Sequence, residues 1–199
     1  MEKEKVYKSV EEFYTDDGIV QPIRAIVNRD LFDFNKVSKI AVDVQLALTW
    51  LASDSEHEKE EGRALWKSLI NSSNIVGYFS AIKISKHDVR IGYSLCKPMD
   101  WPIFNPKIGK TIAINKHGNY NWIVHAFDPK SGVCMPWIEQ KLAMSKALYN
   151  RYVNVGMTHD KNGNKEFIVF SMLGTLDEQL DHFAKRVVRY YKLDEAKNQ

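Results

Sequence analysis

The stretch IVGYFSAIKISKHDVRIGYSLCK, residues 75–97, decides the fold class of this chain. Residues 75–85 and 89–97 are rich in β-branched and aromatic side chains, which pack well on a pleated sheet. The polar residues Lys86, His87 and Asp88 lie between these two runs. The pattern predicts a β-hairpin with a short loop.

Two helices are expected before this hairpin. In residues 37–51, VSKIAVDVQLALTWL, apolar residues recur every three or four positions and form one helical face. The charged link SDSEHEKEEG follows, and its acidic residues suit the positive end of a second helix that runs to about Ser72. We expect the first 30 residues to form a loosely packed arm, with a turn at Asp16-Asp17-Gly18.

Strand and helix signals both occur after the hairpin. Residues 108–115 suit either state, because TIAI favours a strand whereas Pro106 can open a helix. Residues 121–127 and 166–173 are predicted strands, and a long helix is predicted from Pro136 to Gly156. A last helix is predicted over 175–193. Its expected inner face carries Leu176, Leu180, Phe183, Val187 and either Tyr190 or Tyr191.

Consecutive strands with flanking helices indicate an α+β fold. We predict an antiparallel sheet of about four to five strands, with helices packed mainly on one face. The length of 199 residues suits a single domain. In that domain, residues 1–72 would form the N-terminal arm and helical part, and residues 73–199 the sheet and two C-terminal helices.

The composition is that of a globular protein, with 44% hydrophobic and 27% charged residues. No apolar run approaches the roughly 18 to 20 residues that cross a bilayer. The polar start MEKEKVYKSVEEF is unlike a signal peptide. We therefore expect a cytoplasmic protein without membrane contact. Cys96 and Cys134 are then expected to be reduced thiols, and Cys96 a buried structural one.

Charge is unevenly distributed along the chain. Residues 1–72 hold 14 acidic and 10 basic side chains, whereas residues 73–199 hold 11 acidic and 18 basic ones. A basic second part is a reason to consider a polyanionic partner.

Catalytic and cofactor motifs are missing from the sequence. None of the six histidines pairs with another at metal-ligand spacing, and HExxH, CxxC, GxSxG and dinucleotide fingerprints are absent. The segment IGKT at 108–111 lacks the upstream glycine of a phosphate loop. We expect neither a metal nor a cofactor, and we favour a binding protein over an enzyme.

His125 and His117 are the candidate catalytic residues. Strand alternation places His125 on one face with Ile123 and Phe127, and His117 lies in the preceding turn. A histidine beside lysine or arginine can act as the acid or base of a metal-independent nuclease. The interpretation that we favour for His125 is a core or half-buried histidine.

Cations and aromatic rings alternate between residues 83 and 116. Cations neutralise phosphates, aromatic faces stack on bases, and exposed tryptophans anchor protein partners. The candidate binding residues are Lys83, Lys86, Arg90, Lys97, Asp100, Trp101, Phe104, Lys107, Lys110 and Lys116. The alternative is a solvated sheet face with aromatic residues in the core. A second basic cluster, Lys185, Arg186, Arg189 and Lys192, is interpreted as the solvated face of the last helix.

The segment 92–116 resembles part of short accessory proteins from tailed bacteriophages. The shared pattern runs through Gly92-Tyr93-Ser94-Leu95-Cys96-Lys97-Pro98-Met99-Asp100, then Phe104, then Gly109-Lys110-Thr111-Ile112-Ala113. It contains no catalytic group. The basic residues that follow Ile-Ala in those proteins are reduced here to Lys116. The resemblance implies a small early accessory protein rather than a virion component.

Two functional hypotheses result. The first is a phage-type accessory protein that binds a host macromolecule without catalysis, either a host enzyme or defence protein or a nucleic acid. The alternative is a small metal-independent nuclease. A homodimer is also a candidate, because five tryptophans and nine phenylalanines exceed what many small monomers bury.

Overall fold

The computed structural model describes residues 5–28, 34–85, 88–115, 122–125, 153–159, 162–174 and 176–192. The helices are α1 (Val10–Thr15), α2 (Phe34–Leu51), α3 (Glu56–Ser72), the 3-10 helix η1 (Pro98–Ile103), α4 (Pro106–Asn115) and α6 (Leu176–Tyr190). The strands are β1 (Ile19–Asn28), β2 (Asn74–Lys83), β3 (Asp88–Leu95), β4 (Trp122–His125), β5 (Val153–His159) and β6 (Lys165–Met172).

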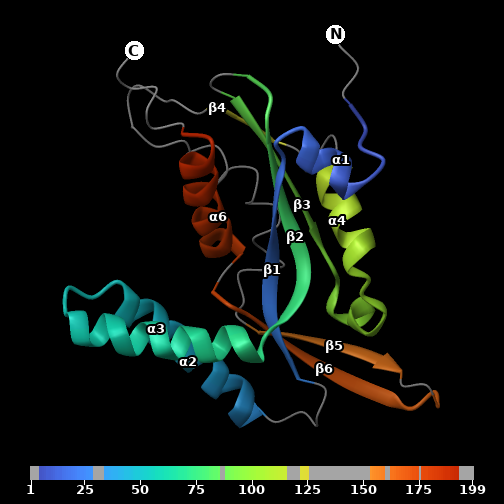
Figure 1. The fold of residues 1–199 in the computed structure, drawn as a ribbon. Coiled ribbons are helices and arrows are strands. Elements are labelled where there is room, and N and C mark those ends of the chain that lie inside the picture. Colours follow the sequence, from blue (N-terminus) through green and yellow to red (C-terminus); the bar gives the residue numbers. More distant parts are fainter. Residues whose placement is uncertain are drawn as a thin grey trace.

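The α+β class and the antiparallel sheet are confirmed. The expected count of four to five strands is not, because six strands pair within the described ranges, in the order β4-β3-β2-β1-β6-β5. The central strand β1 changes partner along its length. Residues 19–25 pair with β2, and residues 25–28 pair with β6. Figure 1 shows β5 and β6 running across the end of β1 at a steep angle.

A bulge accompanies this change of partner. Ile23 pairs with Gly77 and Arg24 with Ile75, so Val76 is an extra residue in β2. Such a residue bends the strand and increases its local twist. The bulge therefore lies where the sheet turns from the β1–β3 part to the β5–β6 part.

The N-terminal segment is not an arm. It supplies α1 and the central strand β1, in which Ile23 and Ala25 are fully buried. The prediction was wrong because Pro22 interrupts a strand-like pattern. Arg24 directs its N–H and C=O away from β2, toward Gln179. Strand alternation puts the nitrogen of Pro22 on that same open side, where a proline costs no ladder hydrogen bond.

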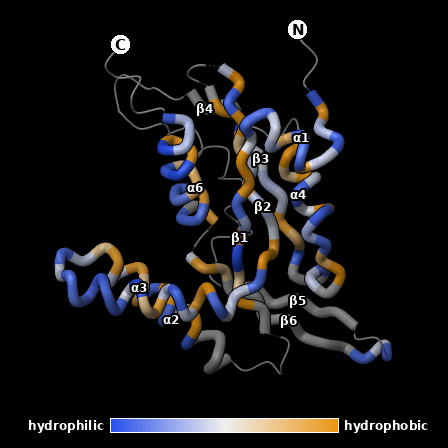
Figure 2. Tube along the Cα trace, viewed as in Figure 1, coloured by the Kyte–Doolittle hydropathy of each residue, from blue (hydrophilic) through white to orange (hydrophobic). Residues whose placement is uncertain are grey.

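Helices cover both faces of the sheet (Figure 1), so the expectation that they pack mainly on one face was wrong. α6 packs on one face, where Phe183 stacks on Phe79 with 5.5 Å between ring centroids. α4 packs on the other face, where the hydroxyls of Ser80 and Ser94 donate to α4 carbonyls at 2.7 Å. In Figure 2 the hydrophobic side of α6 faces the strands and its hydrophilic side faces outward.

Helices α2 and α3 form an antiparallel hairpin at the end of the sheet (Figure 1). A separate core cluster joins them to the strand side of the molecule through Leu173, which directly follows β6. Val44 and Ala47 from α2 and Leu69 from α3 complete the buried part of that cluster. The apolar face predicted for residues 37–51 therefore packs as expected.

Most other element predictions are confirmed. The hairpin appears as β2 and β3, residues 121–127 and 166–173 contribute β4 and β6, and α6 buries its predicted face with Tyr191 rather than Tyr190 inside. Residues 108–115 belong to a helix, α4. The predicted helix to Gly156 was wrong at its end, because Val153–His159 pairs with β6 as a strand. The rest of that predicted helix lies outside the described residues.

Candidate functional site

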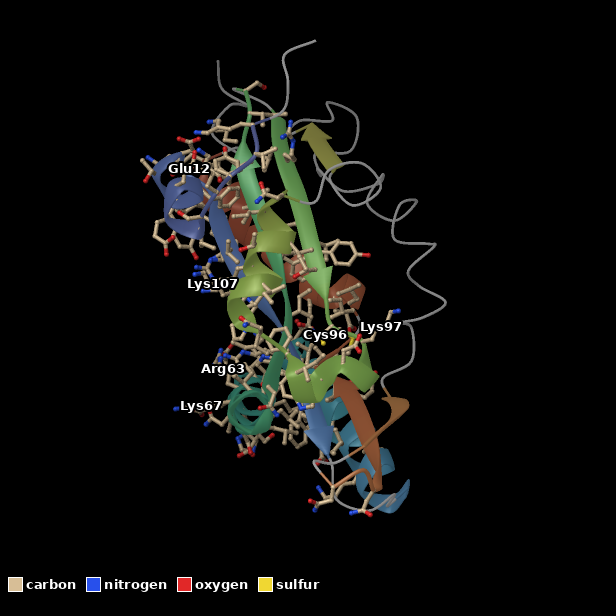
Figure 3. The ribbon with its side chains drawn as sticks, turned by 90° about the vertical axis from the view of Figure 1, so that its right-hand side faces the viewer. Glu12, Arg63, Lys67, Cys96, Lys97 and Lys107 are labelled. Atoms are coloured by element: carbon tan, nitrogen blue, oxygen red, sulfur yellow. The ribbon has the colours of Figure 1, made fainter. Side chains whose placement is uncertain are left out.

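The predicted basic residues are spread over β2, β3, the corner after β3 and α4. Lys83 is exposed at the end of β2, Arg90 is half-buried on β3, and Lys107 is exposed at the start of α4. Figure 3 shows Lys97 beside Cys96 and Lys107 on the other side of α4. Lys86 and Lys116 lie outside the described residues.

The predicted aromatic residues pack against one another. The rings of Trp101 and Phe104 stack with centroids 5.5 Å apart, and Phe104 stacks on Tyr78 at 6.4 Å. The Lys110 ammonium lies 5.5 Å from the Tyr78 ring centroid, on the same assembly. Trp101 also contacts the main core, whereas Asp100 is exposed. The turn between β3 and α4 is therefore a packed corner whose rings stabilise the docking of α4.

The Cys96 thiol lies in the same corner and is half-buried. Burial, and then the charge of Asp100, raise the pKa of this thiol above its ordinary value. A thiol held in its neutral form is a poor nucleophile. This environment suits the structural role predicted for Cys96, whereas Cys134 lies outside the described residues.

His125 ends β4, and its backbone is paired in register with Asp88 of β3. β4 is the edge strand of the described sheet. His117 lies outside the described residues. Within the described ranges, no three His, Cys, Asp or Glu side chains cluster closely enough to hold a metal ion. None of the helices in these ranges is long and apolar enough to cross a membrane.

A groove of about 810 Å³ lies elsewhere, between α6, β1 and the α2–α3 hairpin. Its lining residues are Gln21, Pro22, Arg24, Leu48, Leu51, Trp66, Ile70, Leu173, Glu178, Gln179, His182, Arg186, Arg189 and Tyr190. One wall is cationic and the other is apolar. We call it the α6–hairpin groove.

The cationic wall comes from the face of α6 that borders the groove. Gln179, His182, Arg186 and Arg189 follow one another at steps of three or four residues, which places them along one helical face. The two arginines and His182 are exposed. Arg24 of β1 adds a third guanidinium, and Glu178 is the one carboxylate among the lining residues. The groove therefore carries a net positive charge.

Hydrogen bonds hold the floor of the groove in place. The Gln179 side chain accepts from the Arg24 N–H and donates to the Arg24 C=O, both at 3.1 Å. Arg186 donates to Gln21 at 3.3 Å, and the Arg24 guanidinium donates to Ser73 at 3.4 Å. Each guanidinium has five donors, so both retain donors for a ligand.

The apolar wall comes from the hairpin. Leu48 and Leu51 of α2 and Trp66 and Ile70 of α3 line it, and all four are only half-buried. Half-buried apolar side chains gathered beside fixed cations are typical of a binding surface.

The groove was missed by sequence reasoning. Arg186 and Arg189 were interpreted as part of a solvated face, although their spacing from Gln179 was visible in the sequence. That spacing could have identified the stripe on α6. Nothing local in the sequence indicated that the α2–α3 hairpin would lie opposite it.

Comparisons with known proteins found no relative of this chain, since no protein family model, no curated protein and no solved structure matches it.

Proposed function

We propose that this chain is a binding protein that holds a macromolecular partner without catalysing a reaction on it, and that the α6–hairpin groove is the binding site. The observation that supports the proposal is the pairing of a cationic wall, Arg186 and Arg189, with an apolar wall that includes Trp66. Arginine and tryptophan are the residue types that carry most binding energy in protein interfaces. A phage-type accessory protein in a host cytoplasm, which captures a host macromolecule, fits this function.

The α6–hairpin groove supports the proposed binding function better than the predicted surface between residues 83 and 116 does. There the rings of Trp101 and Phe104 are engaged in packing, and Lys110 lies over Tyr78. In the groove, by contrast, His182 and Arg189 have no hydrogen-bond or ion-pair partner among the described residues.

The test is affinity capture from bacterial lysate with the full chain, read by mass spectrometry with and without nuclease treatment. We expect a stoichiometric partner that the double variant Arg186→Glu/Arg189→Glu fails to capture. Lys185→Glu is the matched control, because Lys185 is exposed on the same helix and pairs with Asp181 at 2.7 Å, outside the groove lining. Capture that survives the double variant would refute the groove as the site. A Lys107→Glu variant would then test the predicted surface.

The alternative function is a metal-independent nuclease that uses His125. His125 ends β4, which lies at an edge of the described sheet. The test is cleavage of RNA and single-stranded DNA in the presence of a chelator. Activity that His125→Ala abolishes, with an unchanged melting temperature, would support the nuclease and refute a purely binding function.

A further inference from the structure

We infer that the occupant of the α6–hairpin groove is an acidic, amphipathic helical segment of a partner protein. This inference rests on the proposed function and names the chemistry of its partner. Its carboxylates would meet the arginines of α6, and its aliphatic side chains would lie on Leu48, Leu51 and Ile70.

The length of the polar face of α6 that lines the groove fits a short helix. From Gln179 to Arg189 this face spans ten helical steps, or about 15 Å at the α-helical rise, with its two fixed positive charges at Arg186 and Arg189. A partner helix of about three turns covers that distance and presents side chains at i, i+3, i+4 and i+7 to a groove. Acidic residues at this spacing can pair with Arg186 and Arg189 in the bidentate geometry that carboxylates and guanidinium groups favour.

An added β-strand is a poor occupant. The open side of β1 at the groove carries Pro22, which has no N–H, and Arg24, whose N–H and C=O are both bonded by Gln179. A peptide strand needs a row of free backbone donors and acceptors. The partner must therefore be recognised through its side chains.

A nucleic acid is also a poor occupant. Successive bases stack on a row of aromatic platforms, whereas the groove lining offers one ring on each wall, Trp66 of the hairpin and Tyr190 of α6. A polyanion that continued along the hairpin would reach Asp54, Glu56 and Glu58 at its far end, all of them exposed (Figure 1). These carboxylates repel phosphates along the path.

The experiment selects binders from a displayed library of random 16-residue peptides with the full-length protein as bait. In parallel, the Arg186→Glu/Arg189→Glu variant is used as bait, and Lys185→Glu serves as the matched control. We expect the wild type and the control to enrich the same peptides, with Asp or Glu and aliphatic residues at helical spacing. Synthetic copies of these peptides should bind the double variant at least about tenfold more weakly. Trp66→Ala should also weaken them, by about tenfold. Circular dichroism and melting curves confirm that the variants fold.

Enrichment without acidic residues, or equal enrichment by the double variant, would overturn the inference. A 15-nucleotide thymidine oligomer is tested by fluorescence anisotropy against the same variants. If it binds the wild type but not the double variant, the groove holds nucleic acid, and the helical-peptide inference fails while the proposed function stands. If captured partners in lysate do not depend on the groove at all, the proposed function fails, and this inference fails with it.

Discussion

At the scale of single residues, Tyr191 joins three parts of the fold. Tyr191 is 7% exposed, and its hydroxyl donates its one proton in a bifurcated hydrogen bond to the carbonyls of Asp17 at 2.6 Å and Ala81 at 3.2 Å. Asp17 is in the left-handed conformation, with φ 62°, in the turn before β1. One buried hydroxyl thus fixes the α1–β1 turn and β2 to the end of α6.

We expect Tyr191→Phe to lower the free energy of unfolding by about 1 to 2 kcal/mol, because two carbonyls lose the one buried donor that they share. Tyr190→Phe is the matched control. Its hydroxyl bonds the Asp17 side chain at 2.8 Å, but Tyr190 is 50% exposed, so water can replace the bond. Urea denaturation of both variants measures these changes in the free energy of unfolding. If both variants lose the same free energy of unfolding, the burial of the Tyr191 hydroxyl does not explain its contribution to stability.

The same residue predicts a pH dependence. Burial raises the pKa of Tyr191 above its ordinary value, so the folded state holds the phenolic proton more tightly than the unfolded chain. Its contribution is complete below the unfolded pKa of about 10 and is lost as the pH rises above that value. Denaturation between pH 8 and 11 should therefore show a steeper loss of stability for the wild type than for Tyr191→Phe. Parallel curves would contradict this assignment.

At the scale of elements, Gln179 takes the place of a neighbouring strand. Its amide gives one donor and one acceptor to Arg24, on the side of β1 where the pairing with β6 ends, and the Leu173 N–H also donates to the Arg24 carbonyl at 3.3 Å. The pair closes a sheet edge that would otherwise be exposed at the floor of the groove. It also fixes the distance between α6 and β1, and hence the position of the arginine stripe.

Gln179→Glu tests this role because glutamate has the same shape. At pH 7 the ionised side chain has no donor and faces the Arg24 carbonyl, so we expect a loss of about 1 to 3 kcal/mol in unfolding free energy. Below the ordinary glutamate pKa of about 4.3 a proton restores the donor, and the difference from the wild type should shrink. A loss that does not depend on pH would argue against the hydrogen-bonded pair.

At the scale of the whole molecule, the described residues pack in separate clusters. α6 and the sheet share the main core, whereas the α2–α3 hairpin is joined to the rest through the cluster that includes Leu173. The groove lies between these two bodies of structure. Its width therefore depends on how firmly the hairpin is held, and local opening of the hairpin would change the binding site.

Leu173→Ala tests this coupling. Leu173 is 2% exposed, and loss of a buried leucine side chain typically costs about 2 to 5 kcal/mol. We expect hydrogen exchange to accelerate in α2 and α3 much more than in β2 and β3. Val76→Ala, in the main core, is the comparison and should affect the strands instead. Uniform acceleration in both variants would show that the molecule opens as one unit.

The sequence by itself determined the periodic elements. Side-chain spacing was enough for α2, α3, α6 and the β2–β3 hairpin, because each depends on local pattern and on an apolar face of fixed period. It also located the two arginines of α6, although not their role. The antiparallel α+β class followed from the order of these elements.

Only the tertiary structure decided the rest, because long-range contacts override local signals. From local sequence, the segment of β1 was predicted to be an arm, but it forms a strand because it pairs with β2 and β6. Likewise, Val153–His159 forms a strand because it pairs with β6. The local sequence does not decide whether the rings of Trp101 and Phe104 are exposed or packed; in the structure Phe104 stacks on Tyr78, and Trp101 stacks on Phe104. The groove needs two walls that lie more than 100 residues apart in the chain, Trp66 and Arg186 among them, and no local pattern encodes that they meet.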